Sequence, residues 1–321
     1  MKLETSCPIV FVQGRRRAPG KRENKVKDTP QAPTGLARRR RRLSDEETGQ
    51  RMLAAALAMV NATGLTVSLD HISFEDVIRD AGVSRSAVYR RWPYKDLFFS
   101  DLLRELAGAA APAAIADEAA TEQLRRFALE HLDGFETPEA RHDLFVELLR
   151  RGAQQDFETI YRSKEWRTYL ALHATFLGLP DGELRTDVQH GLAASERAFI
   201  HRIARSYEEL AALLGYRLRP GAGATFETLA GLVSATMRGL VLTALSTPDV
   251  ATRTTPAGPF GARHTDRWSQ PALGIAGLAC AFLEPDLTIE WNQERFAKVR
   301  AALEGGSRPA TGAGRRRAAD G

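Results

Sequence analysis

Apolar residues recur at helical spacing through almost all of residues 44–304. In one segment after another, leucines and phenylalanines return every three or four positions, as they do on one face of an α-helix. A series of alternating, β-branched segments with hairpin turns between them is missing from the sequence. The chain is therefore predicted to be all-α, and sheet-based folds are excluded.

Residues 44–107 are predicted to form a first domain of three or four short helices. Ser44 and Glu47 have the spacing of a capping box, in which two side chains satisfy free amides at the start of a helix. Pro93 ends the third helix, because a proline removes an amide and clashes with the preceding turn. The expected helices begin at Ser44, Ser73, Ser84 and Lys95.

Residues 108–304 are predicted to form a second, larger all-α bundle. The segment 246–270 is rich in Pro, Gly and Thr, and we expect it to be a mobile loop. The expected helical segments are 118–134, 139–152, 155–177, 190–214, 224–246, 271–283 and 290–303.

Charge is distributed unevenly along the chain. Residues 1–43 carry a net charge of +10, whereas the rest of the chain carries −5. We expect residues 1–43 to form a disordered basic arm and residues 305–321 a disordered tail. The arm is either an electrostatic extension that follows a nucleic-acid backbone or enters a minor groove, or a leader without a role. The sequence does not decide between these two interpretations.

Membrane insertion, disulfides and metal sites are not expected. The longest uninterrupted apolar stretch, Pro271–Leu283, has 13 residues, and about 20 are needed to span a bilayer. Two cysteines, Cys7 and Cys280, cannot build a disulfide framework, and no zinc-ligand spacing is present. These features predict a cytoplasmic protein without metal or cofactor.

The segment Ser73–Arg91 has the features of a helix-turn-helix. Gly82 lies at the expected turn, where a positive φ is usual. Val77 before the turn and Val88 after it are placed to fill the angle between the two helices. A compact pair of helices is therefore predicted here, with the second helix from Ser84 to Arg91.

The outward face of that second helix predicts contact with DNA. A helical wheel gathers Arg85, Ser86, Tyr89 and Arg90 on one side, and residues 81–95 contain four basic residues and no acidic one. Arg85 and Ser86 are expected to contact bases, since an arginine can form paired hydrogen bonds with guanine. An ordinary solvated face is the alternative. Phosphate contacts are expected from Ser73, Tyr89, Arg90, Arg91 and Lys95, and Ser84 completes the DNA-binding candidates.

The motif AGVSRSAVYRRWPYKDLF, residues 81–98, resembles the DNA-binding domain of the TetR family of bacterial transcriptional regulators. The resemblance covers about Ser44–Leu106. It implies a homodimer whose third helices enter successive major grooves, with Tyr89 and Lys95 on phosphates. It also implies a helical second domain that carries a ligand pocket and the dimer interface.

Two features depart from the family pattern. Ile78 stands where a small residue is usual, which predicts a slightly wider spacing of the second and third helices. The link between Gly64 and Ile72 is also longer than is typical.

The implied ligand pocket has aromatic candidates in the second domain. Trp166, Tyr169, His173 and Phe176 share one face of one helix, and apolar walls with a few polar groups are typical of small-molecule sites. A packed core explains the same stripe, and both interpretations stay open. The ligand-binding candidates are Phe127, His131, Phe145, Trp166, Tyr169, His173 and Phe176.

The implied dimer interface has candidates in two late helices. Gly231, Ala235 and Gly239 recur every four residues, so that another helix can approach closely. Close packing within one subunit is the alternative. The remaining candidates are Leu240 beside this row, and Leu273 and Gly277 in the last apolar helix.

These observations and the family resemblance predict a sequence-specific transcriptional regulator, a homodimeric repressor that responds to a ligand. An activator or a regulator that depends on a corepressor would have the same sequence features. Its expected partners are operator DNA, a second copy of the chain and an unidentified small-molecule effector. A non-specific architectural DNA-binding protein is the first alternative. A helical enzyme is the second and weaker one, since the sequence contains no serine elbow, phosphate-binding loop or HExxH motif.

Overall fold

The computed structural model describes residues 43–64, 72–109 and 118–305. Apart from their boundary residues, the predicted basic arm, the predicted C-terminal tail and the link between Gly64 and Ile72 lie outside these ranges.

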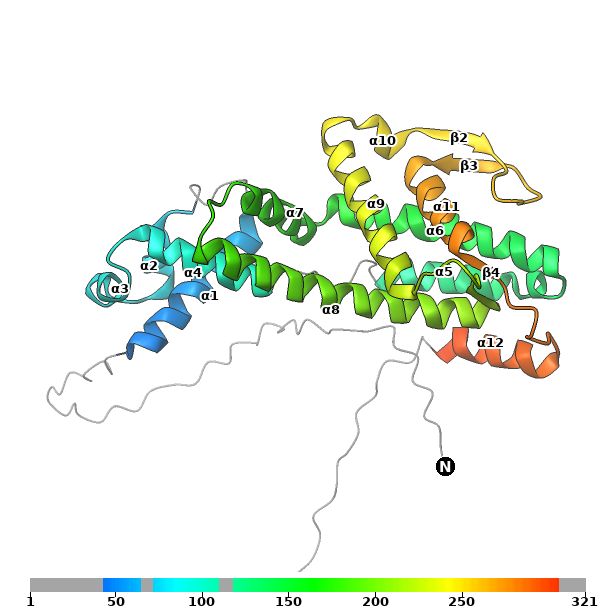
Figure 1. Ribbon diagram of the computed structural model, residues 1–321, viewed down its shortest axis with the longest axis horizontal. Coiled ribbons are helices and arrows are strands. Elements are labelled where there is room, and N and C mark those ends of the chain that lie inside the picture. The colour runs from blue at the N-terminus through cyan, green and yellow to red at the C-terminus, as the bar shows by residue number, and fades with distance from the viewer. Residues whose placement is uncertain (1–42, 65–71, 110–117, 306–321) are drawn as a thin grey trace, which may run out of the picture.

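The described residues form an elongated and mostly helical molecule (Figure 1). The all-α fold class predicted from the sequence is confirmed. Short strands pair in two antiparallel ladders, β1 (Tyr216–Leu218) with β4 (Leu283–Pro285), and β2 (Thr254–Ala257) with β3 (Asp266–Ser269). The helices are α1 (Asp45–Thr63), α2 (Phe74–Ala81), α3 (Arg85–Arg91), α4 (Lys95–Gly108), α5 (Glu118–Glu130), the 3₁₀ turn η1 (Leu132–Phe135), α6 (Pro138–Arg162), α7 (Lys164–Leu177), α8 (Glu183–Leu214), α9 (Phe226–Ser246), α10 (Asp249–Thr252), α11 (Gln270–Phe282) and α12 (Gln293–Gly305).

Helices α1 to α4 begin where the sequence predicts. The hydroxyl of Ser44 accepts a hydrogen bond from the amide of Glu47 (3.0 Å), and the Glu47 carboxylate accepts one from the amide of Ser44 (2.8 Å). Gly82 ends α2 with φ 63° and ψ 31°, the left-handed conformation that glycine adopts without strain. The chain therefore turns directly from α2 into α3, as in a helix-turn-helix.

The angle between α2 and α3 is closed by buried aliphatic side chains. Val77 of α2 and Val88 of α3 are completely buried, as predicted. Ile78, the residue that departs from the family pattern, is also buried in this core.

The core of this domain continues into the second domain. Leu172 of α7 and both Val188 and Leu192 of α8 belong to the same buried cluster as Phe98 of α4. Helix α4 packs along α8. The predicted domain boundary at residue 107 is therefore not a boundary between hydrophobic cores, because α7 and α8 contribute side chains to the core of the first domain.

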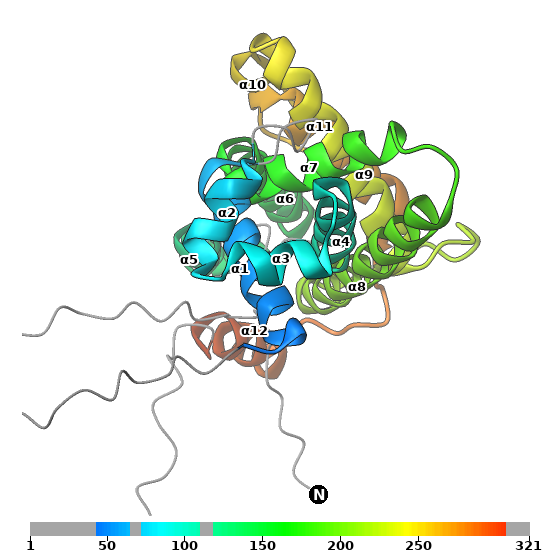
Figure 2. The ribbon, with the colours of Figure 1, turned by 90° about the vertical axis from the view of Figure 1, so that its left-hand side faces the viewer.

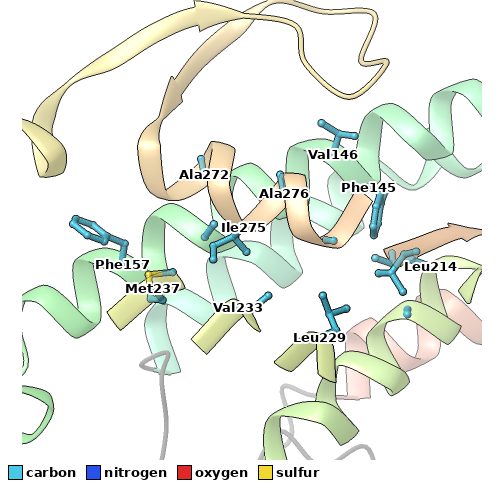
Figure 3. Close-up of a cluster of buried hydrophobic side chains, with 14 of the residues drawn as sticks. Phe145, Val146, Phe157, Leu214, Leu229, Val233, Met237, Ala272, Ile275 and Ala276 are labelled. Carbon is cyan, nitrogen blue, oxygen red and sulfur yellow. The ribbon is translucent and has the colours of Figure 1, made fainter. Parts of the chain in front are cut away.

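A second hydrophobic core lies between α6, α8, α9 and α11 (Figure 3). Figure 3 shows Val233 and Met237 of α9 beside Ile275 of α11, with Phe157 of α6 at one side. All four side chains are nearly or fully buried. Helix α9 is therefore fixed along its inner side by helices on both flanks.

The helix breaks of the second domain differ from the prediction. Helix α6 runs without interruption to Arg162, so the predicted break between residues 152 and 155 was wrong. Gly152 instead lies where α6 packs on α5. A Cβ added at Gly152 would be 3.5 Å from Cδ1 of Leu124. The break is at Ser163, whose hydroxyl caps α7 by accepting from the amide of Trp166 (3.2 Å).

The prediction of a mobile loop at residues 246–270 was also wrong. This segment contains α10 and the β2–β3 hairpin, and α6 holds the tip of the hairpin. His142 Nε2 lies 2.6 Å from the carbonyl oxygen of Phe260, and Asp143 accepts from the amide (2.9 Å) and Nε (2.6 Å) of Arg263. These contacts join residues that are far apart in the sequence, so the local excess of Pro, Gly and Thr does not reveal them.

Within the described residues, α9 is long and apolar enough to cross a membrane by length and composition. Its most apolar window has a mean hydropathy of 1.5, and 39% of that window is buried inside the molecule. The sequence prediction counted only uninterrupted apolar residues, and it did not identify α9 because Arg238 and several hydroxyl residues interrupt this helix. A single helix of this kind also fits a core helix, and α9 packs against α6, α8 and α11.

Candidate nucleic-acid interface

Helix α3 lies at one end of the elongated molecule (Figure 1), and Figure 2 views the molecule from that end. Arg85, Ser86, Tyr89 and Arg90 are all exposed, whereas Val88 is buried. The helix is thus anchored along one side and open along the other. The open side carries two guanidinium groups, a hydroxyl and a phenol, which are groups that hydrogen bond to bases and phosphates.

A single carboxylate of α2 holds two of these side chains. Glu75 Oε2 lies 2.6 Å from Nη2 of Arg85, and Glu75 Oε1 accepts a 3.3 Å hydrogen bond from the Tyr89 hydroxyl. The Tyr89 ring also meets Phe74 edge to face, with 5.9 Å between ring centroids. Arg85 and Tyr89 are therefore partly ordered by contacts within the chain.

Asp45, at the start of α1, contacts both Arg90 and Arg91 of α3. Arg90 forms an ion pair with its carboxylate, and Nη1 of Arg91 donates to its carbonyl oxygen (3.3 Å). The Arg91 guanidinium also lies over the Trp92 ring and against Gly49, where an added Cβ would be 2.9 Å from Cζ. Arg91 thus lies along α1, away from the open side of α3.

The other predicted contact residues lie at helix starts. The hydroxyl of Ser73 caps α2 by accepting from the amide of Asp76 (3.3 Å), and the hydroxyl of Ser84 caps α3 by accepting from the amide of Ala87 (3.3 Å). Lys95 is exposed at the first position of α4. Each of these groups is positioned by the start of its own helix.

A chain of polar contacts leads from the end of α3 to the long helix α8. The buried Trp92 donates through Nε1 to Asp101 of α4 (2.9 Å). Arg104 of α4 then bridges Asp101 (3.0 Å) and Asp187 of α8 (2.8 Å). Any movement of α8 relative to α4 has to stretch or break these contacts.

The second domain contains a small pocket between α6, α7, α8 and α9. It has aliphatic walls and several polar side chains. Burial raises the pKa of Asp156 to about 7 and raises the pKa of the Tyr207 phenol. The lining residues are Asp156, Ile160, Trp166, Ile203, Tyr207, Ala230, Val233, Ser234, Met237 and Arg238.

A partly buried ion pair lies at one side of this pocket. Nη2 of Arg238 lies 2.6 Å from Oε1 of Glu196, and its Nη1 donates to the Tyr169 hydroxyl (2.9 Å). That hydroxyl in turn donates to Glu196. Burial, together with this hydrogen bond to Glu196, raises the pKa of Tyr169.

The aromatic residues predicted to bind a ligand are spread over several sites. Trp166 lines the pocket, and Tyr169 reaches its border through Arg238. Phe145 stacks on Tyr216 with 3.8 Å between ring centroids, inside the hydrophobic core. The remaining candidates lie in other places: Phe127 stacks on His131, His173 hydrogen bonds to the backbone of its own helix, and Phe176 lies beneath Arg185.

The predicted dimer residues divide into two groups. Ala235 and Gly239 are exposed on α9 and Gly231 is partly exposed, with nothing within 4 Å of an added Cβ at either glycine. Exposed leucines extend this face of α9: Leu232, Leu242 and Leu245. The other predicted residues pack within the subunit. A Cβ added at Gly277 would lie 3.6 Å from the Phe260 ring, a Cβ added at Gly274 of α11 would lie 3.8 Å from Leu240, and Leu273 packs on the second hydrophobic core.

Sequence inspection missed several residues of these sites. Glu75 and Asp45 were not among the candidates, and nothing in their spacing shows that they reach α3. The pocket residues Asp156 and Tyr207 lie on two different helices. Arg238 did carry a signal, since it is the one charge after Glu227 in the apolar segment 226–246.

Comparisons with known proteins give distant similarities only. No family model and no curated protein matches the chain. A TetR-family transcriptional regulator from Agrobacterium tumefaciens is 19% identical, with a TM-score of 0.35, and the alignment covers 70% of this chain and 100% of that one. The SmeT–triclosan complex is also 19% identical, with a TM-score of 0.34, and the alignment covers 76% of this chain and 98% of that one.

A third solved structure is TylP, a TetR regulator from Streptomyces fradiae. It is 12% identical to this chain, with a TM-score of 0.30, over 82% of this chain and 99% of that one. The family name that the motif at residues 81–98 suggested thus recurs among the structures that the chain matches. Similarity at this level decides nothing about function, which is argued below from the residues of the chain itself.

Proposed function

We propose that the protein is a sequence-specific DNA-binding transcriptional regulator of the TetR type. The exposed face of α3 is the observation that carries this proposal. Arg85, Ser86 and Tyr89 point outward at one end of the molecule, while Val88 fixes the helix from inside. The major groove of B-DNA is about 12 Å wide and admits one α-helix of this kind.

The regulator acts as a homodimer through the exposed face of α9. This face is formed by Leu232, Ala235, Gly239, Leu242 and Leu245, none of which is charged. Uncharged, apolar exposed patches of this kind are typical of protein interfaces. Two copies are needed because paired recognition helices bind half-sites about 34 Å apart.

The pocket of the second domain binds an effector and is mechanically linked to α3. Trp166 lines the pocket from α7, and Leu172 of the same helix belongs to the core beneath α3. On α8, Tyr207 lines the pocket and Asp187 holds Arg104 of α4. A ligand that shifts α7 or α8 therefore changes the position of α3.

The protein represses transcription when the two α3 helices sit at operator spacing. Effector binding favours another spacing and releases the DNA. A coupling free energy of about 1–3 kcal/mol is typical of such systems, and it changes operator occupancy severalfold to about a hundredfold.

Selection of bound sequences from a random pool of duplex DNA tests this function. The full-length protein is expected to enrich a palindrome whose half-sites are about one helical turn, or a multiple of it, apart. The double variant Arg85→Ala/Tyr89→Ala is then expected to lose selective binding while its circular dichroism and thermal midpoint are kept. Undiminished selective binding by that variant would refute the assignment of α3.

The same experiment separates this function from its first alternative. An architectural protein that binds through its basic arm would enrich no sequence and would be displaced equally by every competitor DNA.

A further inference from the structure

The pocket between α6 and α9 contains an unpaired acidic group. Asp156 lines it, and no hydrogen bond or ion pair reaches the Asp156 carboxyl group from the described residues. Burial raises the pKa of this group to about 7, because taking a carboxylate away from water disfavours its charged form. Asp156 therefore has no charge partner in the described part of the chain, and its side chain is only partly exposed to water.

A second polar group of the pocket is also without a partner. The Nε1 of Trp166 is buried, and no hydrogen bond to it is found in the described part of the chain. The whole Trp166 side chain is only 2% exposed. Buried polar groups are nearly always hydrogen bonded in folded proteins, and this N–H is a donor, so it calls for an acceptor such as a water or carboxylate oxygen and not for an ammonium group.

The positive charge of the pocket is not available to Asp156. Arg238 is the lining residue that could neutralise a carboxylate, but its guanidinium is already paired with Glu196 (2.6 Å) and bonded to Tyr169. The pair contributes no net charge. The negative charge of Asp156 is therefore left to determine which ligand the pocket accepts.

The surroundings of Asp156 favour a cation with an apolar body. Trp166 and Tyr207 offer aromatic rings, and ring faces attract cations. Ile160, Val233 and Met237 complete the walls with apolar surface. An anionic ligand would face an unpaired carboxyl group instead.

We propose that this pocket binds an organic amine, whose ammonium group pairs with Asp156 and whose apolar part lies against Ile160, Val233 and Met237. The proposal rests on the proposed function in one respect only, since it identifies the amine as the effector of the regulator.

The open space in the pocket is about 10 Å³, which is the room of one water molecule. Binding an amine therefore requires several lining side chains, and the helices that carry them, to move apart. Met237 is suited to this, because an unbranched thioether chain adapts its shape more easily than a branched one.

Three compounds with one scaffold test the proposal on the full-length protein. They are 4-butylbenzylamine, 4-butylbenzyl alcohol and 4-butylbenzoic acid, which differ in the charge of one group. Titration calorimetry at pH 8 is expected to show the amine binding at least ten times more tightly than the alcohol, and the acid binding most weakly.

Two variants show whether Asp156 is responsible. Asp156→Asn is expected to lower the affinity for the amine to that for the alcohol, with little effect on the alcohol itself. Asp249→Asn, which removes an exposed carboxylate of α10, is the matched control and is expected to leave all three affinities unchanged. Thermal midpoints confirm that each variant is folded.

Two outcomes would overturn the proposal. One is an amine preference that survives in Asp156→Asn, and the other is the absence of binding by all three compounds. The DNA-binding assay is run on the same preparations. If the protein selects an operator but does not bind the amine, the ligand class is refuted and the proposed function stands. If it binds the amine but selects no operator, the proposed function is refuted and the amine site stands.

Discussion

Glu75 provides a sharp test of the nucleic-acid interface, because its carboxylate holds Arg85 (2.6 Å) and Tyr89 (3.3 Å) in the free protein. If these side chains contact DNA, they have to leave Glu75 or share it. Glu75→Gln removes the ion pair and keeps an oxygen for the Tyr89 hydroxyl. The substitution is therefore expected to strengthen DNA binding.

The size of the effect follows from the exposure of the pair. The two side chains are 73% and 47% exposed, and an exposed ion pair is worth about 0–1 kcal/mol. A release of about 0.5–1 kcal/mol corresponds to a two- to fivefold gain in affinity for one half-site. A homodimer carries Glu75 twice, so the gain on a full palindrome is about 5- to 30-fold.

Asp80→Asn is the matched control for this prediction. Asp80 lies on the same helix and pairs with Arg79 (3.3 Å), not with α3, so that variant changes the net charge by the same amount without freeing Arg85. Fluorescence anisotropy with labelled operator DNA, at several salt concentrations, measures both variants. Glu75→Gln binding no more tightly than Asp80→Asn would refute the reasoning, and weaker binding would mean that Glu75 orients Arg85 in the complex.

Three further predictions concern the pocket, the dimer and the arm. Asp156 has its pKa raised from 3.8 to about 7 on folding, so the folded chain holds the extra proton between these values and the free energy of unfolding falls as pH rises through that window. The Asp156→Asn variant is expected to lack this fall, which is about 4 kcal/mol in urea unfolding at pH 8 compared with pH 4, and an unchanged profile would contradict the prediction. Leu242→Glu places a charge on the exposed face of α9, where the side chain is 52% exposed, and is expected to give folded monomers by light scattering; a stable dimer would exclude this face. Deletion of residues 1–42 is expected to flatten the slope of log affinity against log salt if the arm contacts phosphates, and an unchanged slope would remove the arm from the mechanism.

The first domain could be predicted almost residue by residue, because local chemistry determines it. The capping box at Ser44, the left-handed Gly82 and the burial of Val88 each depend on a few neighbouring residues. The exposed side of α3 follows from the helical repeat alone. What could not be predicted is that Glu75 and Asp45 occupy this side, since that depends on how α1, α2 and α3 pack together.

The second domain was predicted as a bundle but not in its details. Residues 246–270 looked like a loop because Pro and Gly are frequent there, yet His142 and Asp143 of α6 hold them as a hairpin. The aromatic stripe that begins at Trp166 pointed to a ligand site, but only its first member lines the pocket. Contacts between distant helices decide both cases, and the spacing of residues along one helix does not encode them.

Helices α7 and α8 contribute side chains to both hydrophobic cores, and this limits how the chain can be divided. A fragment cut at residue 107 would lose Leu172, Val188 and Leu192 and would open Phe98 and Leu102 to water. The helix-turn-helix is therefore not a module that can be transplanted onto another protein. Any chimera that keeps the DNA preference also has to contain the part of α7 around Leu172 and the N-terminal part of α8 with Val188 and Leu192.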